Sequence, residues 1–267
     1  MTFTIVAPTR RHVASVLAIG EARRLLLHPA MLVGWALLAV VIFIGLISGN
    51  PVTTFGTITT GAVANPGVFC ILAAHMLVTR DARAGTSDMT DVAPATRRQR
   101  GLALLIAAWA PALVALAINL AAHTMFLLTD SYVQAPGPAH IVQAPVAVLG
   151  GTLLGIMLGV WAPARVTPIV AMTALISFCL VLDGGSGGRA LFSPAQSWAD
   201  WGPGNGEQWY ALIPGHPGAH VAYLLGLCAM AAAATWFRLS ARHRAVSVAL
   251  GTVAIAIAAV GGWAQLP

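Results

Sequence analysis

The stretch Arg80–Arg100, RDARAGTSDMTDVAPATRRQR, joins two apolar segments. Among the intervals that carry most of the arginines, it is the longest polar interval between two apolar segments. A short helix is predicted inside it, because Thr86 or Ser87 can accept hydrogen bonds from the first free backbone N–H groups. Asp88 places negative charge in the first turn, and Pro94 cannot continue the helix. We therefore expect a helix of about two turns with a defined start and end.

The predicted helix has two different faces. Met89 and Val92 fall on one side at helical spacing, while Asp88 and Asp91 form a neighbouring acidic side. The alternative is a solvated connection that contacts no other protein. An apolar pair beside an acidic pair favours a surface that docks on a partner protein over a solvated connection.

A second helix is predicted directly behind the proline. Thr96 and Gln99 are three residues apart and match the capping-box pattern, which starts a helix. This helix carries Arg97, Arg98 and Arg100 into the next apolar segment. The loop is therefore expected to be a folded element.

The composition indicates an integral membrane protein. The chain has 267 residues, of which 58% are hydrophobic and 8% charged, and its mean hydropathy is +0.82. These values lie outside the range of soluble globular proteins. A net charge of +6 without lysine could suggest nucleic-acid binding. However, the arginines lie in short clusters between apolar segments, as in membrane proteins. We expect contact with membrane lipids and no nucleic-acid partner.

Seven apolar segments each approach the roughly 20 residues with which a helix crosses a bilayer. They are continuous rather than alternating, which favours helices over a β-barrel. We predict an all-α, multi-pass protein of the cell membrane, with a transmembrane domain at 31–267. Residues 1–30 are expected to form an amphipathic helix on the cytoplasmic surface or a frayed basic tail. The predicted spans lie near residues 31–48, 60–78, 101–128, 141–161, 167–183, 219–237 and 245–263.

The distribution of arginine predicts the orientation. Thirteen of the 14 arginines flank the spans on one side, and only Arg189 falls on the other. The positive-inside rule then places the N-terminus and the loop 80–100 in the cytoplasm. Seven spans would leave the C-terminus and the long interval 184–218 outside.

Small residues repeat along the fourth span. Ala147, Gly151, Gly155 and Gly159 are spaced by four, which puts them on one face where a second helix can approach closely. We favour packing within the subunit over a dimer interface.

The outer interval 184–218 is rich in glycine and tryptophan. Tryptophan favours the headgroup boundary, so Trp198, Trp201 and Trp209 indicate a loop that rests on the membrane. The alternative is a pair of short helices that dip back toward the bilayer as an outer gate.

Polar side chains inside the spans are candidates for function, since burying them in the bilayer is unfavourable. His75 in the second span and His123 and Asn119 in the third belong to this group. His75 is expected near the cytoplasmic end and His123 near the outer end, so spacing does not pair them. A structural role is favoured over a proton relay, and no cluster has the spacing of a metal site.

The sequence contains neither a G-x-x-x-x-G-K-[ST] phosphate loop nor a G-x-S-x-G motif, and no soluble stretch is large enough for a catalytic domain. We therefore predict no catalytic residue and no cofactor in this chain. Uphill transport would need an ion gradient or a separate energy-supplying subunit.

Two runs resemble the membrane subunits of type-2 ATP-binding-cassette (ABC) exporters. EARRLLLHP, residues 21–29, resembles the connecting helix of that family, with Glu21, Arg23 and Arg24. GTSDMTDVAPATRRQR, residues 85–100, resembles the coupling helix that docks on the nucleotide-binding subunit. The corresponding contact residues are Gly85, Thr86, Ser87, Asp88, Met89, Asp91, Val92, Pro94, Arg97 and Arg98.

The resemblance implies a six-span permease core, to which this chain adds a seventh span near 245–263. It also implies an ATPase subunit that binds ATP and Mg²⁺, and a second copy of this chain or a related permease. Spans with almost no charge favour an amphipathic or lipid-like solute. The alternatives are an ion-gradient-driven carrier that uses His75 and His123, and a membrane scaffold without transport activity.

Overall fold

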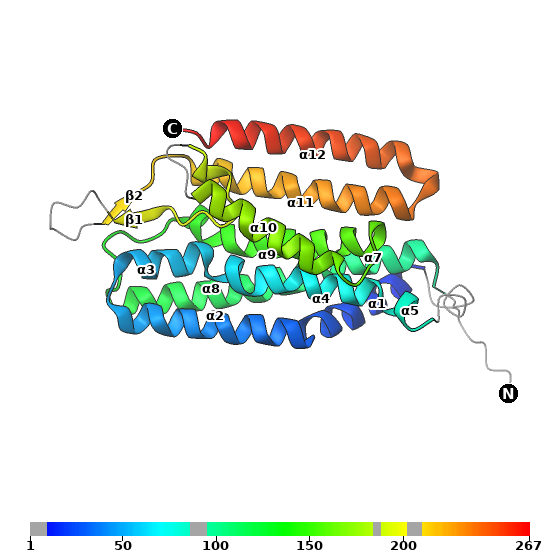
Figure 1. Ribbon diagram of the computed structural model, residues 1–267, viewed down its shortest axis with the longest axis horizontal. Coiled ribbons are helices and arrows are strands. Elements are labelled where there is room, and N and C mark those ends of the chain that lie inside the picture. Colours follow the sequence, from blue (N-terminus) through cyan, green and yellow to red (C-terminus); the bar gives the residue numbers. More distant parts are fainter. Residues whose placement is uncertain (1–9, 86–94, 184–187, 202–209) are drawn as a thin grey trace.

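The computed structural model describes residues 10–85, 95–183, 188–201 and 210–267. Its long helices run side by side in an elongated bundle (Figure 1). Within the described ranges, six helical segments are long and apolar enough to cross a membrane. This confirms the prediction of a helical, multi-span chain.

The first half of the bundle contains an unusual succession of helix types. Its elements are α1 (Arg10–Leu26), α2 (Pro29–Ser48), α3 (Pro51–Gly56), the π-helical turns η1 (Thr57–Gly61) and η2 (Val63–Gly67), α4 (Val68–Val78), α5 (Arg80–Arg83), α7 (Arg97–Ala107) and α8 (Trp109–Leu128).

The second half contains the longest helices and a small hairpin. Its elements are α9 (Pro138–Trp161), α10 (Thr167–Asp183), the 3₁₀ turn η3 (Ala190–Phe192), β1 (Ala199–Trp201), β2 (Tyr210–Leu212), α11 (Pro217–Leu239), the 3₁₀ turn η4 (Ala241–His243) and α12 (Arg244–Ala264).

Side-chain caps fix where two of these helices begin. The capping box predicted before α7 is confirmed: the Gln99 N–H donates to Thr96 Oγ1 at 3.2 Å, and the Thr96 N–H donates to Gln99 Oε1 at 2.9 Å. Asn50 caps α3 in a similar way, since its Oδ1 accepts from the Val52 N–H at 2.9 Å. Each cap satisfies donors that the first turn leaves unpaired.

Prolines alter two of the predicted spans. The second span starts earlier than predicted, at Pro51, directly after the Asn50 cap. It continues past Pro66, which lies in the wide turn η2. The third span is divided at Ala108 into α7 and α8. Pro111 explains this division, because it has no N–H to donate to the carbonyl of Ala107, where α7 ends.

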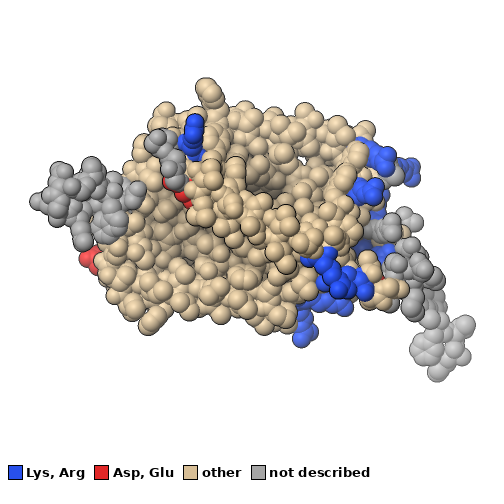
Figure 2. Space-filling view, in the orientation of Figure 1, with Lys and Arg blue, Asp and Glu red and all other residues tan. Residues whose placement is uncertain are grey.

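Helix α10 covers the fifth predicted span but has only 17 residues, so it is shorter than the six long segments. It lies obliquely across the bundle and runs between the same two ends as its neighbours (Figure 1). The C-terminus consequently lies at the end opposite to α1 (Figure 1). Most of the arginines visible in Figure 2 gather at the other end, where α5 and α7 lie, and we call this the arginine-rich end.

Glycines on α9 let it lie directly against η2 and α4. A Cβ atom on Gly155 would be 2.5 Å from the Ile71 carbonyl oxygen, and one on Gly151 would overlap the Gly67 carbonyl oxygen. For Gly159 the nearest atom is Val78 Cβ at 2.8 Å. The predicted packing of these glycines within the subunit is confirmed.

Glycines also let helix α12 pack closely along α11. A Cβ on Gly226 would be 2.5 Å from the Ala258 backbone nitrogen, and one on Gly261 would be 2.6 Å from that of Tyr223. The last predicted span is therefore docked on the bundle through α11.

The described part of the outer interval differs from the predicted pair of short helices. Its described residues contain η3 and an antiparallel hairpin that pairs Ala199 with Leu212 and Trp201 with Tyr210. A pair of short helices is not found in this part of the chain. Pro194 interrupts helical hydrogen bonding after η3, and strand pairing satisfies the backbone groups that follow.

Two glycine-to-alanine substitutions, one at the contact between α9 and α4 and one in α12, should have opposite effects on stability. Gly155→Ala should lower the free energy of unfolding by about 1–3 kcal/mol, because the new methyl group meets backbone. Gly251→Ala should raise it by up to about 1 kcal/mol, because its nearest neighbour is 3.8 Å away and alanine favours helix. The unfolding equilibrium of each variant in detergent gives its free energy of unfolding. Stabilisation by Gly155→Ala would contradict the close helix contact.

Candidate functional site

An apolar cavity of about 650 Å³ lies among η2, α9, α10 and α11. Figure 2 shows the surface hollowed where α10 and α11 lie in Figure 1. The volume falls within the range of about 300–1,000 Å³ that is typical of small-molecule sites. Its lining includes Val63, Gly67, Gly150, Leu154, Leu180 and Ala231.

Few polar groups border this cavity. The thiols of Cys179 and Cys228 reach it, and Asp183, the last residue of α10, contributes a carboxylate. The Cys228 thiol donates to the Val146 carbonyl at 3.5 Å. A lining of this kind complements a hydrocarbon chain and offers little to a strongly polar solute.

A buried polar layer lies between the cavity and the outer hairpin, and Gln143 of α9 is its centre. The Gln143 amide donates to the Gln196 carbonyl at 2.7 Å, and its Oε1 accepts from the Trp198 indole N–H at 2.6 Å. Nearby, the Thr59 hydroxyl donates to the Ser197 carbonyl at 2.7 Å. These bonds attach the outer interval to α9 and η1.

Trp198 is the largest fully buried side chain of the described residues, with 1% exposure. Its φ of 65° lies in the left-handed region, which bulky residues rarely adopt and which the surrounding packing must maintain. The rings of His140 and His220 meet it edge to face, with centroid distances of 5.8 and 5.6 Å. His220 Nδ1 is in turn 2.8 Å from Oε1 of Gln265, near the C-terminus.

The prediction that the tryptophans rest on the membrane is therefore wrong for Trp198. This ring is buried because Gln143 provides a partner for its N–H inside the protein. Trp201 lies in β1, of which the structure describes the backbone pairing, and Trp209 lies outside the described residues.

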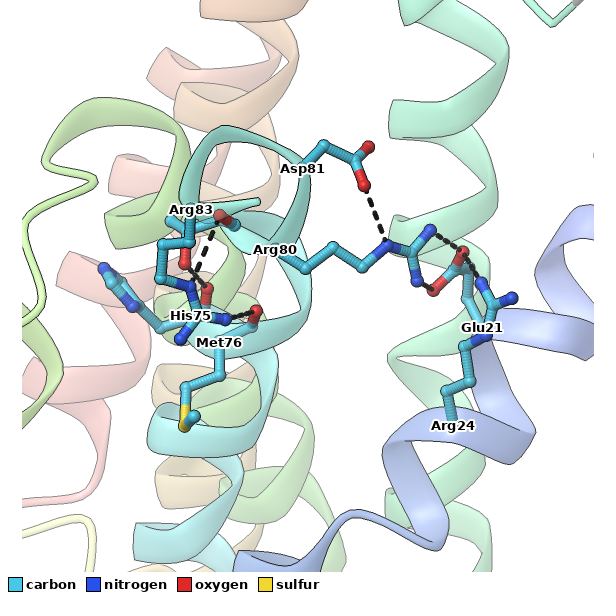
Figure 3. A network of polar contacts seen from close by, with 8 residues as sticks. Glu21, Arg24, His75, Met76, Arg80, Asp81 and Arg83 are labelled. Atoms are coloured by element: carbon cyan, nitrogen blue, oxygen red, sulfur yellow. Dashed lines mark hydrogen bonds and ion pairs between the residues drawn. The ribbon is translucent and has the colours of Figure 1, made fainter. Parts of the chain in front are cut away.

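A cluster of charged side chains joins α1 to the end of α4 at the arginine-rich end (Figure 3). Arg80 donates two hydrogen bonds to Glu21, at 2.8 and 3.0 Å, and a third to Asp81 at 3.3 Å. Arg24 donates to the same Glu21 carboxylate at 3.0 Å. Burial lowers the pKa of Arg80, but its bonds to Glu21 and the charges of Glu21 and Asp81 raise that pKa above its usual value.

The end of α4 is further held by contacts to the backbone. Arg83 donates to the Met76 carbonyl (Figure 3). The Thr79 hydroxyl donates to the His75 carbonyl at 2.8 Å. A positive side chain is favourable there, because the C-terminus of a helix carries partial negative charge. Burial lowers the pKa of His28, and the positive charge of Arg83 lowers it further.

The three polar residues predicted inside the spans have separate partners. His75 Nε2 is 3.2 Å from the Ala162 carbonyl, while His123 Nδ1 is 3.2 Å from the Tyr132 hydroxyl. Asn119 donates to the carbonyls of Ile58 and Ile141, at 2.9 and 2.8 Å. The structure does not bring His75 and His123 together, and Asn119 links α8 to η1 and α9.

The predicted coupling residues are only partly described. Gly85 has a φ of 66°, a conformation that suits glycine, and Arg97 begins α7. Arg98 lies over the ring of Trp236. The remaining predicted contacts lie outside the described residues: Thr86, Ser87, Asp88, Met89, Asp91, Val92 and Pro94.

Sequence reasoning missed two central residues of the site. Gln143 is a polar residue inside a predicted span, as Asn119 is, so the same criterion identifies it as a candidate. Arg80 was counted as a flanking charge, and its pairing with Glu21, 59 positions away, requires the folded chain. Within the described ranges, no group of three or more His, Cys, Asp and Glu side chains could hold a metal ion.

The buried indole predicts a difference between two conservative substitutions. Trp198→Phe should lower the free energy of unfolding by about 1–3 kcal/mol, because Gln143 Oε1 loses its buried donor. Trp263→Phe, at a residue that is 80% exposed, should change it by about 0.5 kcal/mol or less. Equal midpoints in thermal unfolding would contradict the role of Trp198.

No family model, curated protein or solved structure matches the chain. The resemblance to ABC exporter permeases, which rests on residues 21–29 and 85–100, therefore stays a prediction. The geometry of the cavity and of the Glu21–Arg80 pair is the basis on which function is inferred.

Proposed function

We propose that this chain is the membrane subunit of an ABC transporter that exports an amphipathic or lipid-like solute. Two permease chains, identical or related, would enclose the path. A separate ATPase subunit would bind ATP and Mg²⁺ and supply the energy. The chain itself would carry no catalytic residue.

The Glu21–Arg80 pair is the observation that carries the proposal. A transporter of this kind needs a rigid link between the surface that receives the ATPase movement and the helices that respond. Arg80 precedes the segment that resembles a coupling helix, and Glu21 lies in α1, which resembles a connecting helix. Bidentate pairing of a guanidinium with a carboxylate fixes distance and orientation together. Movement of the loop would therefore reach α1 directly.

The apolar cavity supports the proposed class of solute. It is bordered by membrane-length helices on several sides, and its lining is almost entirely hydrocarbon. An amphipathic molecule could place its apolar part there, whereas a small ion would meet no charged path along this lining.

An ion-gradient-driven carrier is the second candidate, and the positions of the histidines favour it less. His75 and His123 bond to Ala162 and Tyr132 in different parts of the bundle. A proton relay needs titratable groups along one path. A scaffold without transport activity is the third candidate, and the coupling experiments below separate it from the first.

The first test concerns the partner contact. Met89→Ala with Val92→Ala should abolish co-purification of the ATPase subunit, because burial of both side chains would contribute roughly 2–4 kcal/mol to association. Val133→Ala with Val166→Ala is the matched control, since both valines are exposed. Pull-down from membranes that contain equal amounts of each variant gives the result. Wild-type recovery of the ATPase together with wild-type transport would reject the coupling role.

The second test concerns transmission. Glu21→Gln should leave the ATPase subunit bound but reduce transport-stimulated ATP hydrolysis at least tenfold, because the link to Arg80 is lost. Over a third of the Arg80 side chain is exposed, so solvent screens the pair and the loss of stability should be about 1 kcal/mol or less.

Arg24→Gln provides the control, because it removes a charge from the same cluster at a side chain that is 60% exposed. It should retain coupled hydrolysis. Full activity of Glu21→Gln would show that this pair does not transmit movement.

A further inference from the structure

Three arginines lie over aromatic rings at the arginine-rich end, where α7, α9, α11 and α12 converge. The guanidinium carbon of Arg98 is 5.3 Å from the ring centroid of Trp236, that of Arg238 is 5.7 Å from Trp161, and that of Arg244 is 5.4 Å from Phe237. The cluster thus joins residues from four helices, and we call it the arginine–aromatic cluster.

The rings of this cluster hold one another in place. Trp161 and Phe237 are stacked, with centroids 6.5 Å apart and planes inclined by 10°. The Trp161 indole N–H donates to the Ala234 carbonyl at 3.1 Å, which connects the end of α9 to α11. The arginines therefore contact fixed surfaces, which lowers the entropy lost when they bind a ligand.

Among the described residues, no carboxylate pairs with the three arginines of this cluster. Within the described ranges, the ion pairs engage Arg24 and Arg80, and none engages Arg98, Arg238 or Arg244. A guanidinium that lies over a ring keeps its N–H groups in its own plane, where they can bond to phosphate oxygens. The cluster can consequently bind an anion through several arginines.

Exposed apolar side chains form a stripe along α12, which starts beside the arginine–aromatic cluster. It begins two residues after Arg244, and its spacing places it on one face of the helix. Its side chains are between 43% and 56% exposed: Val246, Leu250, Val253 and Ile257. Val248 and Ile255, on the opposite face of α12, are exposed to a similar degree. A positively charged cluster followed by an apolar stripe matches a molecule with an anionic head and hydrocarbon chains.

We propose that the arginine–aromatic cluster binds the headgroup of an anionic phospholipid, whose acyl chains lie along α12. Basic pockets between the ends of membrane helices are suited to such headgroups. An inorganic phosphate ion would satisfy the arginines but not the apolar stripe. The site is separate from the proposed transport cavity, and its occupancy does not depend on ATP or on transport.

The test uses the full chain in nanodiscs of phosphatidylcholine with increasing phosphatidylglycerol, followed by native mass spectrometry of the retained lipid. The variant carries Arg98→Gln, Arg238→Gln and Arg244→Gln. The control carries Arg23→Gln, Arg165→Gln and Arg242→Gln, which removes equal charge from exposed positions at the same end. Each arginine that contacts the headgroup should contribute about fivefold to the affinity, so the variant, which removes three such contacts, should bind phosphatidylglycerol roughly a hundredfold more weakly. The control arginines lie outside the cluster, so their loss should weaken binding no more than severalfold.

A further variant separates a defined site from diffuse attraction. Trp161→Leu with Phe237→Leu keeps all the charges but removes two of the three rings, and it should also lose preferential retention of phosphatidylglycerol. Equal retention by wild type and the arginine variant would overturn the proposal. So would equal losses in the variant and the control, or complete displacement of phosphatidylglycerol by inorganic phosphate. Thermal unfolding in phosphatidylcholine alone verifies that each variant is folded.

Discussion

Helix α9 can contact the backbone of η2 and α4 only because glycine occupies the positions where they meet. No hydrophobic force draws helices together in lipid, so dispersion contacts at short range must provide the attraction. The glycines of α9 permit that short range along several turns. Once α9 is fixed in this way, Gln143 is fixed as well, and with it the anchoring of Trp198 and the outer hairpin.

The two ends of the bundle are stabilised by different chemistry. At one end, neutral amides, rings and backbone carbonyls surround Trp198 and need no net charge. At the other end, the Glu21 carboxylate forms ion pairs with two arginines, and further arginines lie over aromatic rings. The cavity lies among helices that connect these ends.

The regular parts of this fold could be predicted from sequence because they follow from local rules. Apolar runs of membrane length, the Thr96–Gln99 capping box and the spacing of the α9 glycines each depend on neighbouring residues. Chemistry that depends on distant partners was predicted poorly. Tryptophan near a span end usually favours the interface, but at Trp198 a buried acceptor on another helix changes the outcome. The π-helical turn that contains Pro66, within one long span, also has no signal among the neighbouring residues.

Helix α10 has a mechanical consequence for the surrounding bilayer. Its 17 residues give a length of about 25 Å, less than the roughly 30 Å of a typical hydrocarbon core. Its oblique course shortens its reach across the membrane further (Figure 1). Lipid beside α10 must therefore thin or deform to cover its apolar surface, whereas lipid beside the longer helices need not. Because α10 forms one wall of the cavity, the thinnest annulus of lipid would lie against that wall.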